Sequence, residues 1–254
     1  MWPRFPARRG APWCVNATVE LLITAGRYGE ARRIGGAREG SAATSQDPCN
    51  EVLIQINLAE ADYNLGDWAG AWERLRSLDA PASGFPITQA GLLLQRAWIA
   101  AHDRRGAEAL ALWEQADIRG LPQAYRAEHF FTQVSVLLAL GRVEEAEEAA
   151  LAGESAALRS SSQRNAVFML ARVVAAGSEW EAAEALCREA AGHRYRHQGG
   201  DGLLLWGDCL VKLGRTGEAR QAFALAIERD AESESAARAR YRLQVFEGTG
   251  LSSL

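Results

Sequence analysis

The segment LGRTGEA at residues 213–219 shows the pattern that decides the fold of this chain of 254 residues. A turn residue follows an apolar run, and an acidic or small residue and then Ala come next. Similar segments precede it: AGRYGEA (25–31), LGDWAGA (65–71), HDRRGAEA (102–109), LGRVEEA (140–146) and GSEWEAA (177–183). The closing Ala recurs at intervals of 36–40 residues, which predicts six structural repeats.

Each repeat is predicted to be a pair of α-helices joined by a tight turn. The turn glycines can adopt a positive φ and so end the first helix with a left-handed cap; they are Gly26, Gly66, Gly141 and Gly214. The closing Ala lies in the second helix, where a small side chain lets two helices approach closely. One such hairpin exposes too large an apolar face to be stable alone, so neighbouring hairpins must stack.

The last repeat also carries a longer pattern, Leu203-x₂-Trp206-Gly207-x₂-Leu210 followed by Ala219-x₃-Phe223. With this pattern the chain resembles the tetratricopeptide repeat family over about residues 13–230. The period is longer than the roughly 34 residues of that family, and the Pro that often ends its repeats is absent. The resemblance implies an all-α solenoid of αα-hairpins, a right-handed superhelix with a C-terminal capping helix.

We expect three parts along the chain. Residues 1–12 form a basic arm rich in Pro and Arg, either a tether to an acidic partner or membrane surface or a frayed end. Residues 13–232 hold the six repeats, with a linker at 35–47 and an N-cap at Asp47 before Pro48. Residues 233–254 form a capping helix, polar on one face, and a short tail.

Stacked hairpins curve, and their first helices line the concave side. Counting back from each turn places Asn16 and Glu20 near this groove in the first repeat. The partner-binding residues predicted in the later repeats are Ile56, Glu60, Tyr63, Leu94, Trp98, Phe131, Ser135, Phe168, Arg172, Asp208 and Lys212. The central part of this groove is apolar and aromatic, which is typical of a surface that binds another polypeptide. Some of these side chains could instead pack between repeats.

The sequence therefore predicts a non-enzymatic scaffold that binds a partner protein or peptide in this groove. The alternative is a regulatory subunit that inhibits or activates an enzyme or signalling complex. Some tetratricopeptide proteins hold a chaperone's terminal carboxylate with Lys, Arg and Asn. Here only Asn16 and Asn57 match, so we do not expect that activity.

Histidine and cysteine residues give little sign of chemistry. His193 and His197 lie four residues apart with Cys187 upstream, a spacing that could hold a metal ion or serve catalysis. The basic, aromatic segment HRYRHQ (193–198) could instead contact RNA or phosphate, or simply end a helix before a Gly199–Gly200 turn. We favour the helix end, and expect neither metal nor cofactor.

Composition narrows the class of protein further. The formal net charge of −4 makes nucleic acid an improbable partner. No uncharged apolar run is long enough to span a membrane, and the N-terminus lacks the apolar core of a signal peptide. The default expectation is a cytoplasmic protein. Lys212 is the only lysine among 28 basic residues, a bias typical of GC-rich genomes and hence of a bacterial source.

Overall fold

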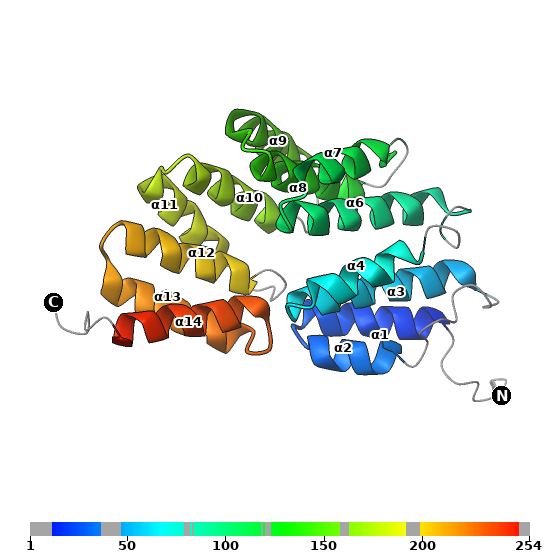
Figure 1. The fold of residues 1–254 in the computed structure, drawn as a ribbon, viewed down its shortest axis with the longest axis horizontal. Helices are drawn as coiled ribbons and strands as arrows, with labels where there is room; N and C mark the ends of the chain where they lie inside the picture. The colour runs from blue at the N-terminus through cyan, green and yellow to red at the C-terminus, as the bar shows by residue number, and fades with distance from the viewer. Residues whose placement is uncertain are drawn as a thin grey trace, which may run out of the picture.

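The computed structural model describes residues 12–36, 47–78, 82, 84–117, 119, 123–157, 163–191 and 199–248. These residues form thirteen α-helices and contain no β-strand (Figure 1). Twelve of the helices pair as consecutive antiparallel hairpins, and the last stands alone at the C-terminal end. The predicted all-α solenoid of αα-hairpins with a terminal helix is confirmed.

The hairpins follow the six sequence repeats. Each consists of a first and a second helix: α1 (Pro12–Thr24) and α2 (Tyr28–Gly36); α3 (Pro48–Asn64) and α4 (Trp68–Arg76); α6 (Pro86–His102) and α7 (Gly106–Gln115); α8 (Gln123–Ala139) and α9 (Val143–Ala157); α10 (Gln163–Ala176) and α11 (Trp180–Ala191); α12 (Gly199–Lys212) and α13 (Thr216–Arg229). The terminal helix is α14 (Glu234–Gly248). Asp47 caps α3 through a bond from the Asn50 amide, as predicted.

The six hairpin turns share one hydrogen-bonded cap. At the last one the Gly214 amide donates to Val211 and the Arg215 amide donates to Leu210, the Schellman arrangement. The four predicted turn glycines all have positive φ, from 72° to 86°. The other two turns place Arg104 (φ 59°) and Ser178 (φ 67°) at the same position. The geometry therefore persists even where glycine is missing.

The closing Ala of each repeat lies at the contact between helices. All six of these residues are 0% exposed: Ala31, Ala71, Ala109, Ala146, Ala183 and Ala219. Glycine allows still closer contacts at two further positions. A Cβ added at Gly207 would lie 2.3 Å from Phe223 Cε1, and one added at Gly35 would lie 2.7 Å from Leu58 Cδ2. Small residues thus set the spacing between helices, both within a hairpin and between neighbouring hairpins.

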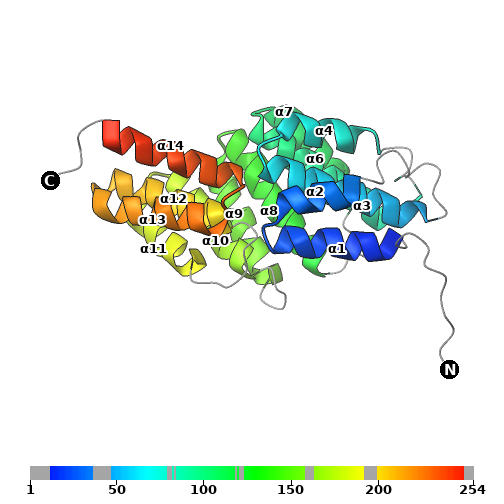
Figure 2. The ribbon, with the colours of Figure 1, turned by 90° about the horizontal axis from the view of Figure 1, so that it is seen from below.

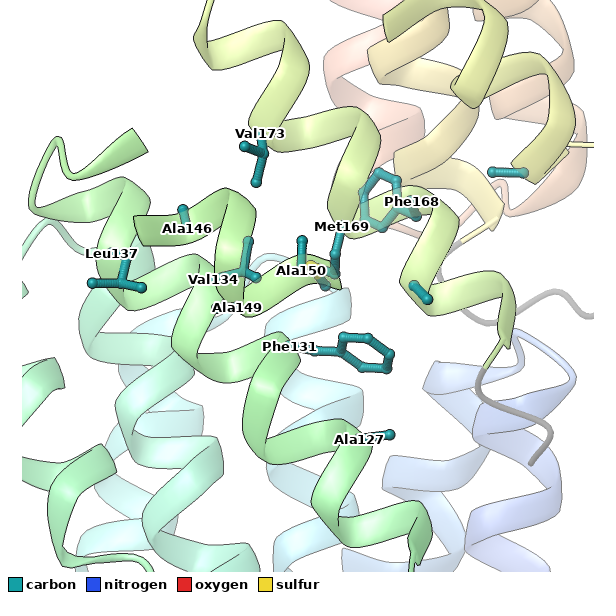
Figure 3. Packing of buried hydrophobic residues seen from close by; sticks show 12 residues of the cluster. Ala127, Phe131, Val134, Leu137, Ala146, Ala149, Ala150, Phe168, Met169 and Val173 are labelled. Atoms are coloured by element: carbon teal, nitrogen blue, oxygen red, sulfur yellow. The ribbon is translucent and has the colours of Figure 1, made fainter. Parts of the chain in front are cut away.

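The buried apolar residues form a chain of clusters along the solenoid and no single centre. Figure 3 shows one cluster, where Phe131 of α8, Ala150 of α9 and Met169 of α10 meet. Others join α3, α4 and α6, or α12, α13 and α14. Each hairpin thus completes the core of its neighbour, as expected of stacked repeats.

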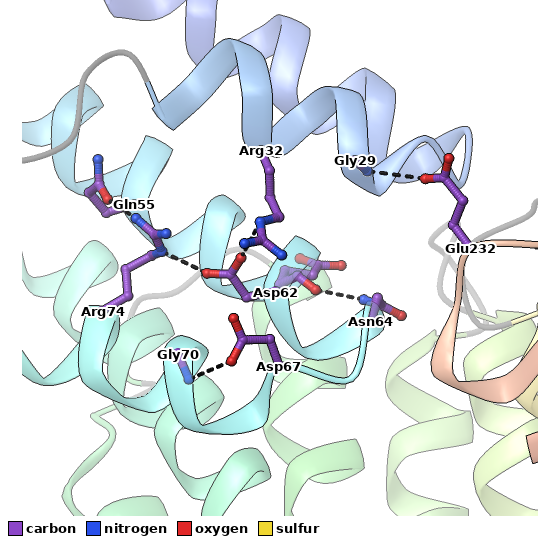
Figure 4. Close-up of polar contacts among 10 residues, drawn as sticks. Gly29, Arg32, Gln55, Asp62, Asn64, Asp67, Gly70, Arg74 and Glu232 are labelled. Carbon is purple, nitrogen blue, oxygen red and sulfur yellow. Dashed lines mark hydrogen bonds and ion pairs between the residues drawn. The ribbon is translucent and has the colours of Figure 1, made fainter. Parts of the chain in front are cut away.

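One buried ion-pair network stabilises the second hairpin. Asp62 of α3 accepts a 2.9 Å hydrogen bond from Arg74 Nε and lies 3.0 Å from Arg32 Nε (Figure 4). Arg74 Nη1 also donates to Gln55 Oε1 at 2.8 Å. Burial raises the pKa of Asp62, while the two arginines act in the opposite direction. The network thus links α2, α3 and α4.

The two ends of the solenoid touch each other. The hairpins follow an arch from α1 to α14 (Figures 1 and 2). Across the closure, the Gly29 amide donates to Glu232 Oε2 at 3.3 Å (Figure 4), and Trp68 Nε1 donates to Glu234 Oε2 at 2.6 Å. Tyr28 bonds Asp230, and its pKa is raised by burial and by that carboxylate. The arch is closed into a ring.

Some predicted boundaries differ from the structure. Gly35 and Gly36 end α2 and so lie outside a linker, because the missing side chain lets α2 approach Leu58. Gly199 and Gly200 begin α12 and do not form the predicted turn. Residues 1–11 of the arm, 37–46 of the linker and the tail beyond 248 lie outside the described residues. Among the residues described, no helix combines the length and apolar character that crossing a bilayer requires.

Candidate functional site

Two adjoining cavities lie on the inner side of the arch. The first has a volume of about 310 Å³ and is lined by α3, α6, α8 and α10. The second has a volume of about 630 Å³ and is lined by α6, α8, α10, α12 and α14, with contributions from two hairpin turns and Trp68. Trp98 of α6 lines both. We refer to the two cavities together as the groove.

The first cavity has an apolar floor. Ile56, Leu94 and Phe131 line it but are 6%, 4% and 1% exposed, because most of each side chain packs between repeats. Tyr63 and Trp98 are half-buried and present more of their surface. A ligand in this cavity would bury its apolar groups against the faces of a few aromatic and aliphatic side chains, because these side chains do not protrude from the floor.

Two buried polar atoms on residues that line the first cavity have no hydrogen-bond partner among the described residues. They are Trp98 Nε1, a donor, and Gln95 Oε1, an acceptor, one turn apart on α6. Buried polar atoms are nearly always paired, so such exceptions point to a missing partner. The walls also carry Glu60 and Glu128, which make this end of the groove acidic.

Arg172 of α10 lines the second cavity. Its Nη1 donates to Ser135 Oγ at 2.8 Å, and its guanidinium lies 5.3 Å from the Trp98 ring and 6.0 Å from the Phe168 ring. Burial lowers the pKa of Arg172. An arginine in such surroundings still keeps its charge.

The far wall of the second cavity comes from α12 and α14. Asp208 pairs with Arg242 at 2.9 Å, and Ser235 donates to Asp201. On the opposite wall, Trp68 stacks on His102 with ring centroids 3.4 Å apart and reaches Glu234 across the ring closure. Arg104 and Arg238 complete the lining. Two of the residues that close the ring, Trp68 and Glu234, thus also form part of the groove.

Comparison with known proteins identifies the fold. Peptide-bound NprR, solved with its cognate peptide NprX, superposes with a TM-score of 0.69 at 12% identity, over 96% of this chain and 74% of that one. A Rap protein complexed with Competence and Sporulation Factor gives 0.68 at 14% identity, over 94% and 82%. Kinesin light chain TPR-like repeats from Podosopora anserina give 0.51 at 18% identity, over 72% and 95%. The chain has the tetratricopeptide repeat fold. No protein-family model and no curated protein matches it by sequence.

Within this tetratricopeptide fold, ten of the eleven predicted partner-binding residues line the groove. The first cavity takes Ile56, Glu60, Tyr63, Leu94, Trp98 and Phe131, and the second takes Trp98, Ser135, Phe168, Arg172 and Asp208. Lys212 does not: it is exposed, and its ammonium lies 5.6 Å from the Trp180 ring. Asn16 bonds Asn57, and Glu20 is exposed outside the lining. The exposed apolar patch is smaller than the sequence predicts.

Sequence reasoning missed two groups of groove residues. The first group, Gln95, Glu128 and Thr132, lies on the same helix faces as the predicted residues, so a search at i±3 and i±4 could have found it. The second group is Trp68, Arg104, Glu234 and Arg238, which lies at turns and on α14. Nothing local marks the second group: Arg104 lies in a hairpin turn, and Trp68, Glu234 and Arg238 join the cavity where α14 meets α4.

The histidine and cysteine candidates do not assemble into a site in the described part of the chain. His193 and His197 lie outside the described residues. Cys187 of α11 is fully buried and hydrogen-bonds Cys209 of α12, which raises the pKa of Cys187. No group of three His, Cys, Asp or Glu residues that could hold a metal ion occurs among the residues described.

Proposed function

We propose that this chain is a non-enzymatic scaffold that binds a short, extended peptide segment of a partner in the groove. The observation that carries the proposal is the pair of unpartnered atoms on α6, Trp98 Nε1 and Gln95 Oε1. A peptide main chain offers one acceptor and one donor per residue, and so complements this pair. The apolar residues that line the same cavity supply burial for side chains.

The size and shape of the groove support a peptide as the ligand. Cavities of about 310 and 630 Å³ fall in the range of specific ligand sites, which is roughly 300–1,000 Å³. Of the similar structures given above, NprR was solved with its cognate peptide NprX, and the Rap protein was solved with Competence and Sporulation Factor. Because their identity to this chain is 12–14%, they support the binding mode and not a particular sequence.

The test uses a pool of random seven-residue peptides, with retained peptides quantified by mass spectrometry. Trp98→Phe keeps the ring and removes only the Nε1 donor, so we expect retention to fall about threefold to tenfold. Trp180→Phe is the matched control, since Trp180 lies on α11 and lines neither cavity. Wild-type protein that retains no peptide, or a Trp98→Phe variant that retains as much as the control, would refute the proposal.

A second candidate, a regulatory protein whose shape responds to its ligand, is favoured by one contact. Glu234 and Trp68 line the second cavity and also fasten the ring closure. A ligand that touches either residue acts on the closure as well, and so can shift the balance between closed and open rings. Small-angle scattering tests this. A changed radius of gyration with the peptide pool supports regulation, and an unchanged one supports a rigid scaffold.

A further inference from the structure

Arg172 brings a positive charge into the second cavity, and no carboxylate among the described residues lies in ion-pair contact with it. Nη1 is engaged by Ser135 Oγ at 2.8 Å and lies 3.3 Å from Met169 Sδ. No acceptor among the described residues bonds Nε or Nη2. A guanidinium has five N–H donors in a planar fork, and the free part of this fork has the geometry that receives a carboxylate.

The surroundings of Arg172 fix its direction and strengthen its interactions. The guanidinium is held beside the Trp98 ring at 5.3 Å and the Phe168 ring at 6.0 Å. Ser135, which holds Nη1, is itself 5% exposed and anchored through its hydroxyl to the Phe131 carbonyl. A fork fixed in this way loses little freedom when it binds an anion, and the apolar rings reduce screening by water.

The charges on the cavity walls favour an anion with a single charge. Arg104 and Arg238 also line this cavity and form no ion pair within the described residues. The acidic groups of the lining already have partners; they are Asp201 with Ser235, Asp208 with Arg242, and Glu234 with Trp68. The three arginines and three carboxylates of the lining balance, so the lining offers no excess positive charge for a phosphate dianion or a nucleic acid. A single carboxylate can instead pair directly with Arg172, which has no ion-pair partner among the described residues.

We infer that the groove recognises a peptide with an acidic side chain, Asp or Glu, whose carboxylate pairs with Arg172. This inference rests on the proposed function. The position of Arg172 decides between a side chain and a chain terminus. Arg172 lies next to Trp98, where the two cavities join, and the second cavity continues beyond it to Asp208 and Arg238. A peptide lying in both cavities passes Arg172 midway, and so presents a side chain there.

The experiment uses random seven-residue peptides that are acetylated and amidated, so that Asp and Glu carry the only carboxylates. Peptides retained by the wild-type protein are sequenced by mass spectrometry. We expect Asp or Glu to be enriched about tenfold at one position, the effect of a charged hydrogen-bonded pair. Arg172→Gln should abolish this enrichment and still retain apolar peptides, and Arg172→Lys should give an intermediate value. Arg188→Gln is the control, an equal loss of charge on an exposed part of α11.

The outcomes separate this inference from the proposed function. Peptides retained without acidic enrichment, or enrichment that survives Arg172→Gln, overturn the role of Arg172 and leave peptide binding intact. No retention by the wild type refutes both. A second pool has free C-termini and lacks Asp and Glu; if Arg172→Gln affects only that pool, the ligand is a terminal carboxylate and the side-chain assignment is wrong. Circular dichroism of each variant excludes unfolding as the cause.

Discussion

Gly207 of α12 faces the ring of Phe223 in α13, and we expect Gly207→Ala to destabilise the protein. The added Cβ would lie 2.3, 2.6 and 2.8 Å from three ring atoms, whereas carbon atoms in contact normally lie about 3.5–4.0 Å apart. Overpacking of this kind costs about 1–3 kcal/mol, and the better helix propensity of Ala returns about 1 kcal/mol. Three simultaneous overlaps on a ring that is 0% exposed place the cost at the upper end, for a net loss of about 2 kcal/mol.

Urea unfolding followed by circular dichroism measures this loss as a lower midpoint with an unchanged slope. Gly202→Ala is the matched control in the same helix, since its new Cβ would lie 3.9 Å from the nearest atom, Phe168 Cδ2. That variant should gain about 0.5–1 kcal/mol. Adding Phe223→Leu to Gly207→Ala should relieve the overlap, with a coupling energy of about 1 kcal/mol or more. A Gly207→Ala protein as stable as the wild type would show that the contact does not limit helix spacing.

Three further variants test other features of the fold. Ser178→Gly should raise the free energy of unfolding by about 1 kcal/mol, because φ at Ser178 is 67°. An unchanged free energy of unfolding would argue against strain at this turn. Arg74→Met should cost about 3 kcal/mol by leaving Asp62 poorly paired. Since burial raises the pKa of Asp62, protonation relieves that charge, so the loss measured by urea unfolding should be smaller near pH 5 than near pH 8; the reverse trend would contradict this assignment. Glu234→Ala removes the acceptor for Trp68 and should raise amide hydrogen exchange in α1 and α2 several-fold with no change in helix content; unaltered exchange would show that this bond does not hold the closure.

The sequence predicts the repeat architecture well because its signals are local. A closing Ala such as Ala146 must be small where two helices cross, and a turn glycine such as Gly141 must adopt a positive φ. Both requirements recur once per hairpin and need no knowledge of distant residues. Positions such as Arg104 escape detection because the hydrogen bonds of the turn impose a positive φ on a residue that does not favour it.

The groove is predictable only where it depends on a single helix face. Trp98 and Arg172 follow from counting back along first helices. The exposure of Phe131 does not, because its burial depends on how closely the next hairpin approaches. The sequence predicts a capping helix that is polar on one face, but it does not place Arg238 of that helix in the second cavity, which follows because α14 lines the inner side of the arch. Contacts between distant segments decide these placements.

The contact between the two ends also changes how this solenoid should fold. In an open array of repeats each unit depends only on its neighbours, so terminal units fray independently and unfolding can proceed from either end. Here a hydrogen bond joins residues 203 positions apart, and a second joins residues 166 apart. The terminal hairpins consequently support each other, and neither can melt without releasing the other. We expect one cooperative transition where a linear array would unravel stepwise, and slower folding, since the ends must find each other across nearly the whole chain.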